Sequence, residues 1–244
     1  MSDYYQTLKD KFSQYEFLDD ALEWLSKNTQ KLADLFSNYS IRDYIFEPFK
    51  DVFKNPKQTV DKDVYLTITS VAILNAVLAG LPGKLGVGIY VSMAFELWMA
   101  YRIAQHVGIE LERPKDIAQY FGLLLATVGT VLYVFRILIG VGFSLFSFVA
   151  PIANPLIFAE LLVTDFIGVL FWVGFTEAKQ QGEFAIPKRM FKTLINVTKE
   201  IYSYQFSILK GLFNIKNIKS TGKKIKDYVT GDQVTNQRQA NGEL

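Results

Sequence analysis

The sequence predicts an all-α protein built around a polytopic helical membrane bundle of about four spans, with cytoplasmic amphipathic helices at both ends. Three observations predict this fold class. Of the 244 residues, 50% are hydrophobic and only 20% are charged, below the roughly 25% of a typical soluble chain. Between Ile117 and Ala159 the only charged side chain is Arg136. Helical patterns with one apolar face flank this region on both sides.

Residues 1–63 are predicted to form N-terminal cytoplasmic amphipathic helices. Apolar residues recur there at three- and four-residue steps, as in Tyr4, Leu8, Phe12 and Tyr15, which places them on one face of a helix. The first residues are polar and acidic, so we do not expect a signal peptide. We expect a small helical cap that packs its apolar face on another part of the protein.

Residues 64–175 are predicted to form the membrane region, because a spanning helix needs about 20 mostly apolar residues. The apolar runs that meet this length are 64–81, 85–104, 117–139 and 156–175. The third run continues to residue 150, which is too long for one upright helix. Either the helix breaks at Gly140 and 143–150 is re-entrant or interfacial, or the whole of 117–150 is one tilted and kinked helix.

The distribution of basic residues predicts the orientation. An even number of spans places both termini on one side, and both terminal segments carry many Lys residues. The 105–116 connection holds Arg113 and Lys115, whereas 140–155 holds no charge. Because Lys and Arg concentrate in cytoplasmic connections, both termini are predicted to be cytoplasmic, in a bacterial inner membrane or an equivalent one.

Residues 176–219 are predicted to form a basic amphipathic cytoplasmic helix, and 220–244 a flexible polar tail. Positive side chains surround an apolar stripe that runs from Phe191 to Ile215; they include Lys188, Arg189, Lys192, Lys199 and Lys210. Such a helix either lies on the anionic cytoplasmic leaflet of the lipid bilayer or docks on the N-terminal helices. The sequence leaves both alternatives open.

Ionisable residues inside the predicted spans are the candidate functional residues, because a charge at the bilayer centre costs roughly 2.5–3.5 kcal/mol. Helix rise of about 1.5 Å per residue places Glu96 and Asp165 near the midplane. Arg136 and Glu160 fall near the outer side, on successive helices, where we expect a neutralising pair. Glu96 and Asp165 are expected to be carboxyls buried in the bundle, with a polar, water-accessible path as the alternative.

Small residues predict where the helices pack. They recur on one face of the first and third spans, at Ala72, Ala76 and Gly80 and at Gly122, Ala126 and Gly129. Small side chains let membrane helices approach closely. We expect packing within the bundle, and the alternative is a seam between copies of the chain.

Enzymatic chemistry is not expected. The chain has no cysteine and one histidine, His106, which cannot build the usual zinc or nucleophile sites. We therefore predict no catalytic residues, no metal and no cofactor. The near-neutral, hydrophobic composition also argues against a nucleic-acid partner.

The stretch from Ala72 to about Phe184 resembles the YcjF-like family of bacterial membrane domains. The resemblance is carried by AILNAVLAGLP, by GIYVSMAFELWMAYRIAQHVGIEL and by LLVTDFIGVLFWVGFTEAKQQGEF. Such domains often stand beside or are fused to GTPase domains, so the resemblance implies a membrane module with a partner acting in trans. It implies no catalytic residues.

These features together predict a non-enzymatic integral membrane protein, an anchor or scaffold that assembles with itself or with a cytoplasmic protein partner. One alternative is an oligomeric ion channel or pore-forming effector with Glu96 and Asp165 on its path, and another is a small transporter. A further alternative is a soluble protein with a buried hydrophobic hairpin that inserts only when triggered.

Overall fold

The computed structural model describes residues 27, 44–54, 60–80, 87–109, 155–181 and 188–230. The described residues form helices and contain no strand, so the predicted all-α class is confirmed. The elements are η1 (Glu47–Phe53), α4 (Lys62–Gly80), α5 (Val87–Val107), α7 (Pro155–Gln181), η3 (Lys188–Met190), α8 (Phe191–Leu209) and α9 (Ile215–Thr230).

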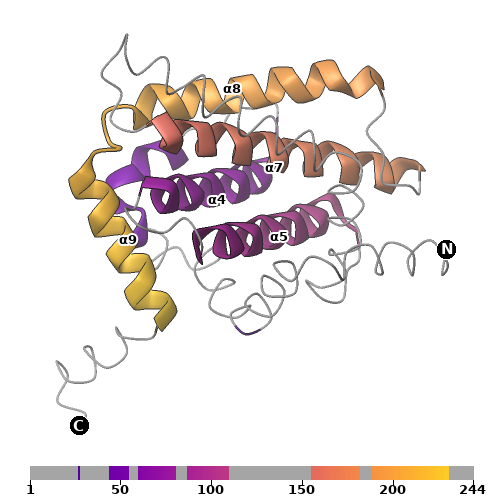
Figure 1. Cartoon of the computed structure of the whole chain (residues 1–244). Coiled ribbons are helices and arrows are strands. Elements are labelled where there is room, and N and C mark those ends of the chain that lie inside the picture. The colour runs from indigo at the N-terminus through magenta and orange to yellow at the C-terminus, as the bar shows by residue number, and fades with distance from the viewer. Residues whose placement is uncertain are drawn as a thin grey trace.

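Helices α4, α5 and α7 form a three-helix bundle in which each contacts the other two (Figure 1). α4 is its innermost helix, and its residues from Val64 to Val77 are buried. α5 runs parallel to α7, because the Ser92 hydroxyl meets Glu160 near their N-terminal ends. Near their C-terminal ends, Lys179 Nζ donates a hydrogen bond of 2.6 Å to the carbonyl oxygen of Val107.

Glycines allow α4 and α7 to approach closely in an antiparallel arrangement. A Cβ at Gly168 would lie 2.7 Å from Ile68 Cγ1, and one at Gly80 would lie 2.8 Å from Ile157 Cδ1. The other two predicted packing residues of α4, Ala72 and Ala76, are fully buried. Predicted packing residues Gly122, Ala126 and Gly129 lie outside the described residues.

Helix α8 lies along α7 in the antiparallel direction and also contacts η1 (Figure 1). Its inner face consists of Leu194, Val197, Thr198, Ile201, Gln205 and Leu209, which are buried. These residues follow the three- and four-residue spacing of one helical face. The sequence left open whether this helix rests on lipid or on the N-terminal helices, and in the structure it packs on α7 and η1.

An aromatic cluster closes the end of the bundle where α7 begins. The Phe158 ring lies 5.0 Å from that of Phe206 and 5.6 Å from that of Phe213, centroid to centroid. Phe49 of η1 packs on the same Phe213 ring in a tilted arrangement, with the centroids 5.1 Å apart. The cluster therefore ties η1, α7 and α8 to the turn before α9.

The predicted flexible tail is corrected in its first part. The sequence assigned 220–244 to a tail, but α9 continues to Thr230. Ile218, Thr221 and Ile225 lie on one face of α9 and are buried. These apolar residues are spread through a Lys-rich, Gly-containing stretch, which obscures the helical periodicity. Residues 231–244 lie outside the described part of the chain, as does most of the predicted N-terminal helical segment.

Two described helices, α4 and α7, are long and apolar enough to cross a membrane, and most of each is buried inside the protein. They coincide with the first and last predicted spans, although α7 continues six residues beyond the predicted end at 175 and stops at Gln181. α5 coincides with the second predicted span. The third lies outside the described residues, so the count of four spans stays a prediction.

Candidate functional site

Polar side chains from four helices meet at the centre of the molecule and form what we call the polar seam. The seam consists of Thr69 and Asn75 of α4, Glu96 of α5, Thr164 and Asp165 of α7, and Gln205 of α8. All six are buried. The structure therefore brings the two predicted midplane carboxyls to one region of the bundle.

One half of the seam joins α4, α5 and α7. Asn75 Nδ2 donates hydrogen bonds to Thr164 Oγ1 at 3.1 Å and to Glu96 Oε1 at 3.5 Å. Glu96 is 4% exposed, in agreement with the expectation of a carboxyl buried within the bundle. The amide of Asn75 thus links the two neighbours of α4 through one side chain.

The other half joins α4, α7 and α8. Gln205 Nε2 donates hydrogen bonds to Asp165 Oδ1 at 3.0 Å and to Thr69 Oγ1 at 3.1 Å. Thr164 and Asp165 are consecutive, so they stand at one level of α7 on faces about 100° apart. The two halves of the seam consequently lie on two sides of α7 at the same height.

Several buried atoms of this region have no hydrogen-bond partner within the described structure. They are Asn75 Oδ1, Asp165 Oδ2 and Gln205 Oε1 in the seam, and Thr198 Oγ1 and the Tyr202 hydroxyl beside it on α8. Burial raises the pKa of the Tyr202 phenol well above its usual range. Unpartnered buried polar atoms weaken the attachment of the helices that carry them.

The predicted pair of Arg136 and Glu160 is not tested, because Arg136 lies outside the described residues. Glu160 itself is partly buried and accepts a hydrogen bond of 3.5 Å from Ser92 Oγ of α5. This acidic group of α7 therefore also faces a neighbouring helix.

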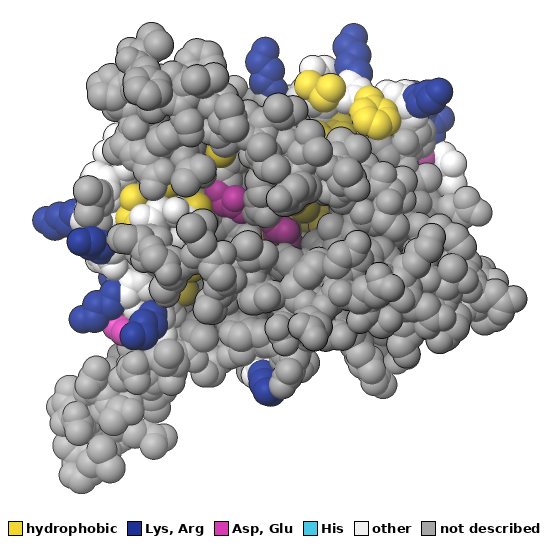
Figure 2. Space-filling model, in the orientation of Figure 1, with side chains coloured by type: hydrophobic (Ala, Val, Ile, Leu, Met, Phe, Trp, Pro, Cys, Tyr) yellow, Lys and Arg dark blue, Asp and Glu magenta, His cyan; other side chains and the backbone are white. Residues whose placement is uncertain are grey.

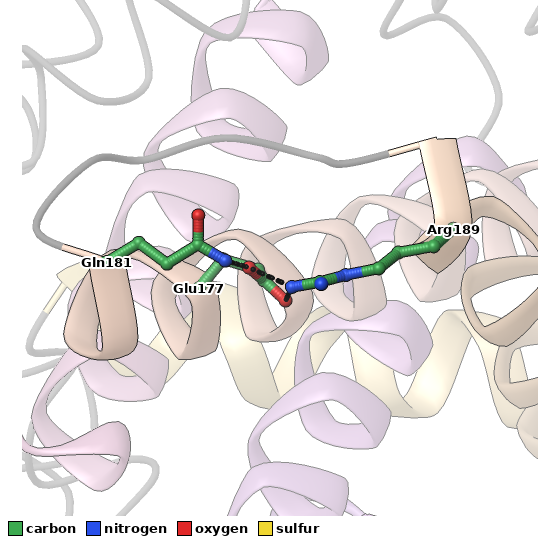
Figure 3. A network of polar contacts seen from close by, with 3 residues as sticks. All are labelled: Glu177, Gln181 and Arg189. Carbon is green, nitrogen blue, oxygen red and sulfur yellow. Dashed lines mark hydrogen bonds and ion pairs between the residues drawn. The ribbon is translucent and has the colours of Figure 1, made fainter.

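The predicted basic residues divide into two groups. Lys188, Lys192, Lys199 and Lys210 are exposed. Arg189 is also exposed, but its side chain pairs with α7, where its Nη2 lies 3.2 Å from Glu177 Oε2. Gln181 Nε2 donates to the same Glu177 oxygen at 2.5 Å, so Arg189 of η3 and Gln181 of α7 converge on one carboxylate (Figure 3). Glu177 is 3% exposed and depends on these two partners.

Sequence reasoning missed the neutral members of the seam and the Glu177 contact. Asn75 was visible as an amide within an uncharged apolar run, and Gln205 as a polar residue on the apolar stripe of the basic helix. The depth argument applies to ionisable residues and does not identify neutral amides.

No group of three or more His, Cys, Asp or Glu side chains that could hold a metal ion occurs among the residues that the structure describes. Comparison with known protein families, with curated proteins and with solved structures finds no match to this chain. The resemblance to YcjF-like membrane domains therefore stays a prediction.

Proposed function

We propose that this chain is a non-enzymatic integral membrane protein, an anchor that holds its terminal helices as a scaffold for itself or for a cytoplasmic protein partner. One observation carries the proposal. Within the α4–α5–α7 bundle, two acidic side chains at the depth of the predicted spans each meet a polar side chain of a neighbouring helix: Glu96 meets Asn75 and Glu160 meets Ser92. Inward-facing, partnered carboxyls are typical of helices whose outer surface contacts lipid.

The length and composition of α4 and α7 support the same proposal. A hydrocarbon core of about 30 Å requires a helix of roughly 20 residues. α7 has 27 residues and exceeds this length, and α4 has 19 residues and closely approaches it. The exposed lysines of α8 would then face anionic lipid or an acidic partner on the cytoplasmic side. In this proposal both termini are cytoplasmic.

The same contacts favour an anchor over a channel. A conducting path needs polar groups that face a continuous water-filled space. Glu96 is 4% exposed and Asp165 is fully buried, and their hydrogen-bond partners belong to the same chain. Copies assembling around the outside of the bundle would not bring these two carboxyls to a shared path.

Membrane flotation after carbonate extraction tests the proposed anchor. The chain expressed in bacteria is expected to float with the lipid after alkaline carbonate, and chain that stays at the bottom of the gradient would refute the proposal. Phe166→Lys, at a partly exposed position near the middle of α7, is expected to reduce the floating fraction. Ser203→Lys adds the same charge to an exposed position of α8 and is the matched control.

A further inference from the structure

We propose that α8 is a removable cover of α7, and that α7 enters the membrane only after α8 has left it for the anionic membrane surface. This inference rests on the proposed function, because it concerns how the anchor inserts. It follows from the position of α8 along α7 and from the difference between the two faces of α8.

Three contacts fix α8 along nearly the whole of α7. Arg189, just before α8, meets Glu177 near the C-terminal end of α7. Gln205 meets Asp165 farther along, and Phe206 packs on Phe158 near the N-terminal end of α7. If α7 crossed a bilayer with α8 still attached, each part of α8 would therefore lie at the same depth in the bilayer as the part of α7 beside it.

The outer face of α8 cannot remain in hydrocarbon. It presents Lys192, Asn196, Lys199, Ser203 and Ser207, all exposed. Lys199 lies between the Glu177 and Asp165 contacts, and so stands level with the central turns of α7. A lysine at the bilayer centre is costly unless it is paired or reaches an interface. The arrangement in the structure therefore shields α7 from lipid on this side and is incompatible with α7 crossing a bilayer while α8 stays attached.

The contact of α8 with the bundle leaves several buried polar atoms without a partner among the described residues. The inner face of α8 is apolar apart from Thr198, Gln205 and the neighbouring Tyr202. Each of these three side chains carries a buried polar atom that has no partner among the described residues. Release returns those atoms to water or headgroups, while the apolar residues of the same face can insert shallowly into a leaflet, as amphipathic helices do.

The N-terminal end of α8 already presents a surface suited to anionic lipid. Phe191 and Ile195 are 49% and 57% exposed, and Lys188 and Lys192 stand beside them in the sequence and are exposed too. Figure 2 shows hydrophobic side chains among Lys and Arg side chains along this upper edge of the molecule. Apolar side chains ringed by lysine match an anionic leaflet in both chemistry and charge.

A cross-link between α7 and α8 tests the inference, and the absence of native cysteine makes the cross-link specific. Phe158→Cys with Phe206→Cys places two thiols where the rings lie 5.0 Å apart, and a cleavable bis-maleimide would join them. Val107→Cys with Lys179→Cys joins α5 to α7, where Lys179 Nζ lies 2.6 Å from the Val107 carbonyl oxygen. It is the control, because these two helices stay together in the inserted state.

The purified 244-residue chain is mixed with vesicles of phosphatidylglycerol and phosphatidylcholine, extracted with carbonate and floated. We expect the α7–α8 cross-link to lower the carbonate-resistant fraction about ten-fold, and cleavage of the linker to restore it. The α5–α7 cross-link should leave insertion unchanged, and vesicles of phosphatidylcholine alone should support less insertion. Equal insertion of the α7–α8 cross-linked and uncross-linked proteins would overturn the inference while leaving the anchor intact. Failure of the unmodified chain to insert would overturn both.

Discussion

The side chain of Gln205 on α8 donates a hydrogen bond of 3.0 Å to the carboxylate of Asp165 on α7, and neither residue is exposed. This bond sets the register of α8 on α7. It also supplies the buried Asp165 side chain with its hydrogen-bond donor from another helix, so the two residues are expected to be energetically coupled.

Gln205→Leu is expected to lower the free energy of unfolding by about 1–3 kcal/mol, because it leaves a buried carboxyl without its donor. Replacing both partners by leucine should cost less than the sum of the two single changes. Denaturant titration of the four proteins of this cycle measures the coupling. Ser207→Ala, at an exposed site of α8, is the control, and additive single changes would show that the bond contributes nothing.

Gly168→Ala is expected to destabilise the protein by about 1–3 kcal/mol, because the new methyl group overpacks the contact of α7 with α4. The added Cβ would lie 2.7 Å from Ile68 Cγ1 and 3.0 Å from Ile68 Cγ2. Thermal unfolding provides the measurement. Gly211→Ala has no atom within 4 Å of the added Cβ and should be tolerated. Ile68→Ala should recover part of the loss in the Gly168→Ala background, and no recovery would contradict the close approach.

Arg189→Met is expected to destabilise the protein by about 1–2 kcal/mol, because the Glu177 carboxylate would remain buried without its cation. This expected loss of stability is smaller than for a fully buried ion pair, because the Arg189 side chain is 65% exposed. Lys192→Met removes an exposed charge from the same segment and is the matched control. In a Glu177→Gln background Arg189→Met should cost little, and an unchanged cost there would argue against the pair.

Phe191→Ser combined with Ile195→Ser is expected to weaken binding to anionic vesicles about ten-fold, since two exposed apolar side chains are lost from the surface facing lipid. Vesicle co-sedimentation over a lipid titration provides the affinity. Tyr44→Ser removes a comparably exposed side chain, which is 48% exposed and precedes η1. This change should leave the affinity for vesicles unaltered. Equal weakening by both changes would show that the patch on α8 has no special part in binding.

The helical class and the positions of α4 and α7 were predictable from the sequence, because apolar length and helical periodicity are local properties. The buried state of Glu96 and Asp165 was also expected, since an ionisable side chain within a span is costly unless it faces the bundle interior. What the sequence did not reveal is which helices share a contact.

The seating of α8 on α7 depends on Gln205 meeting Asp165 and on Phe206 meeting Phe158. Such pairings join residues far apart in the chain and leave no local pattern. Helix α9 was missed for a different reason. Its buried residues Ile218, Thr221 and Ile225 are embedded in lysines, which resemble a solvated tail until the helix has a surface to pack on.

The most direct test of the account is the environment of the middle of α7 in a membrane. Phe166→Cys gives the chain its single cysteine at a partly exposed position of α7, and the thiol can carry a nitroxide. With the protein in anionic vesicles, the account predicts that the nitroxide collides mainly with oxygen, which dissolves in hydrocarbon. Collision mainly with a water-soluble nickel complex would place α7 in water and contradict the account.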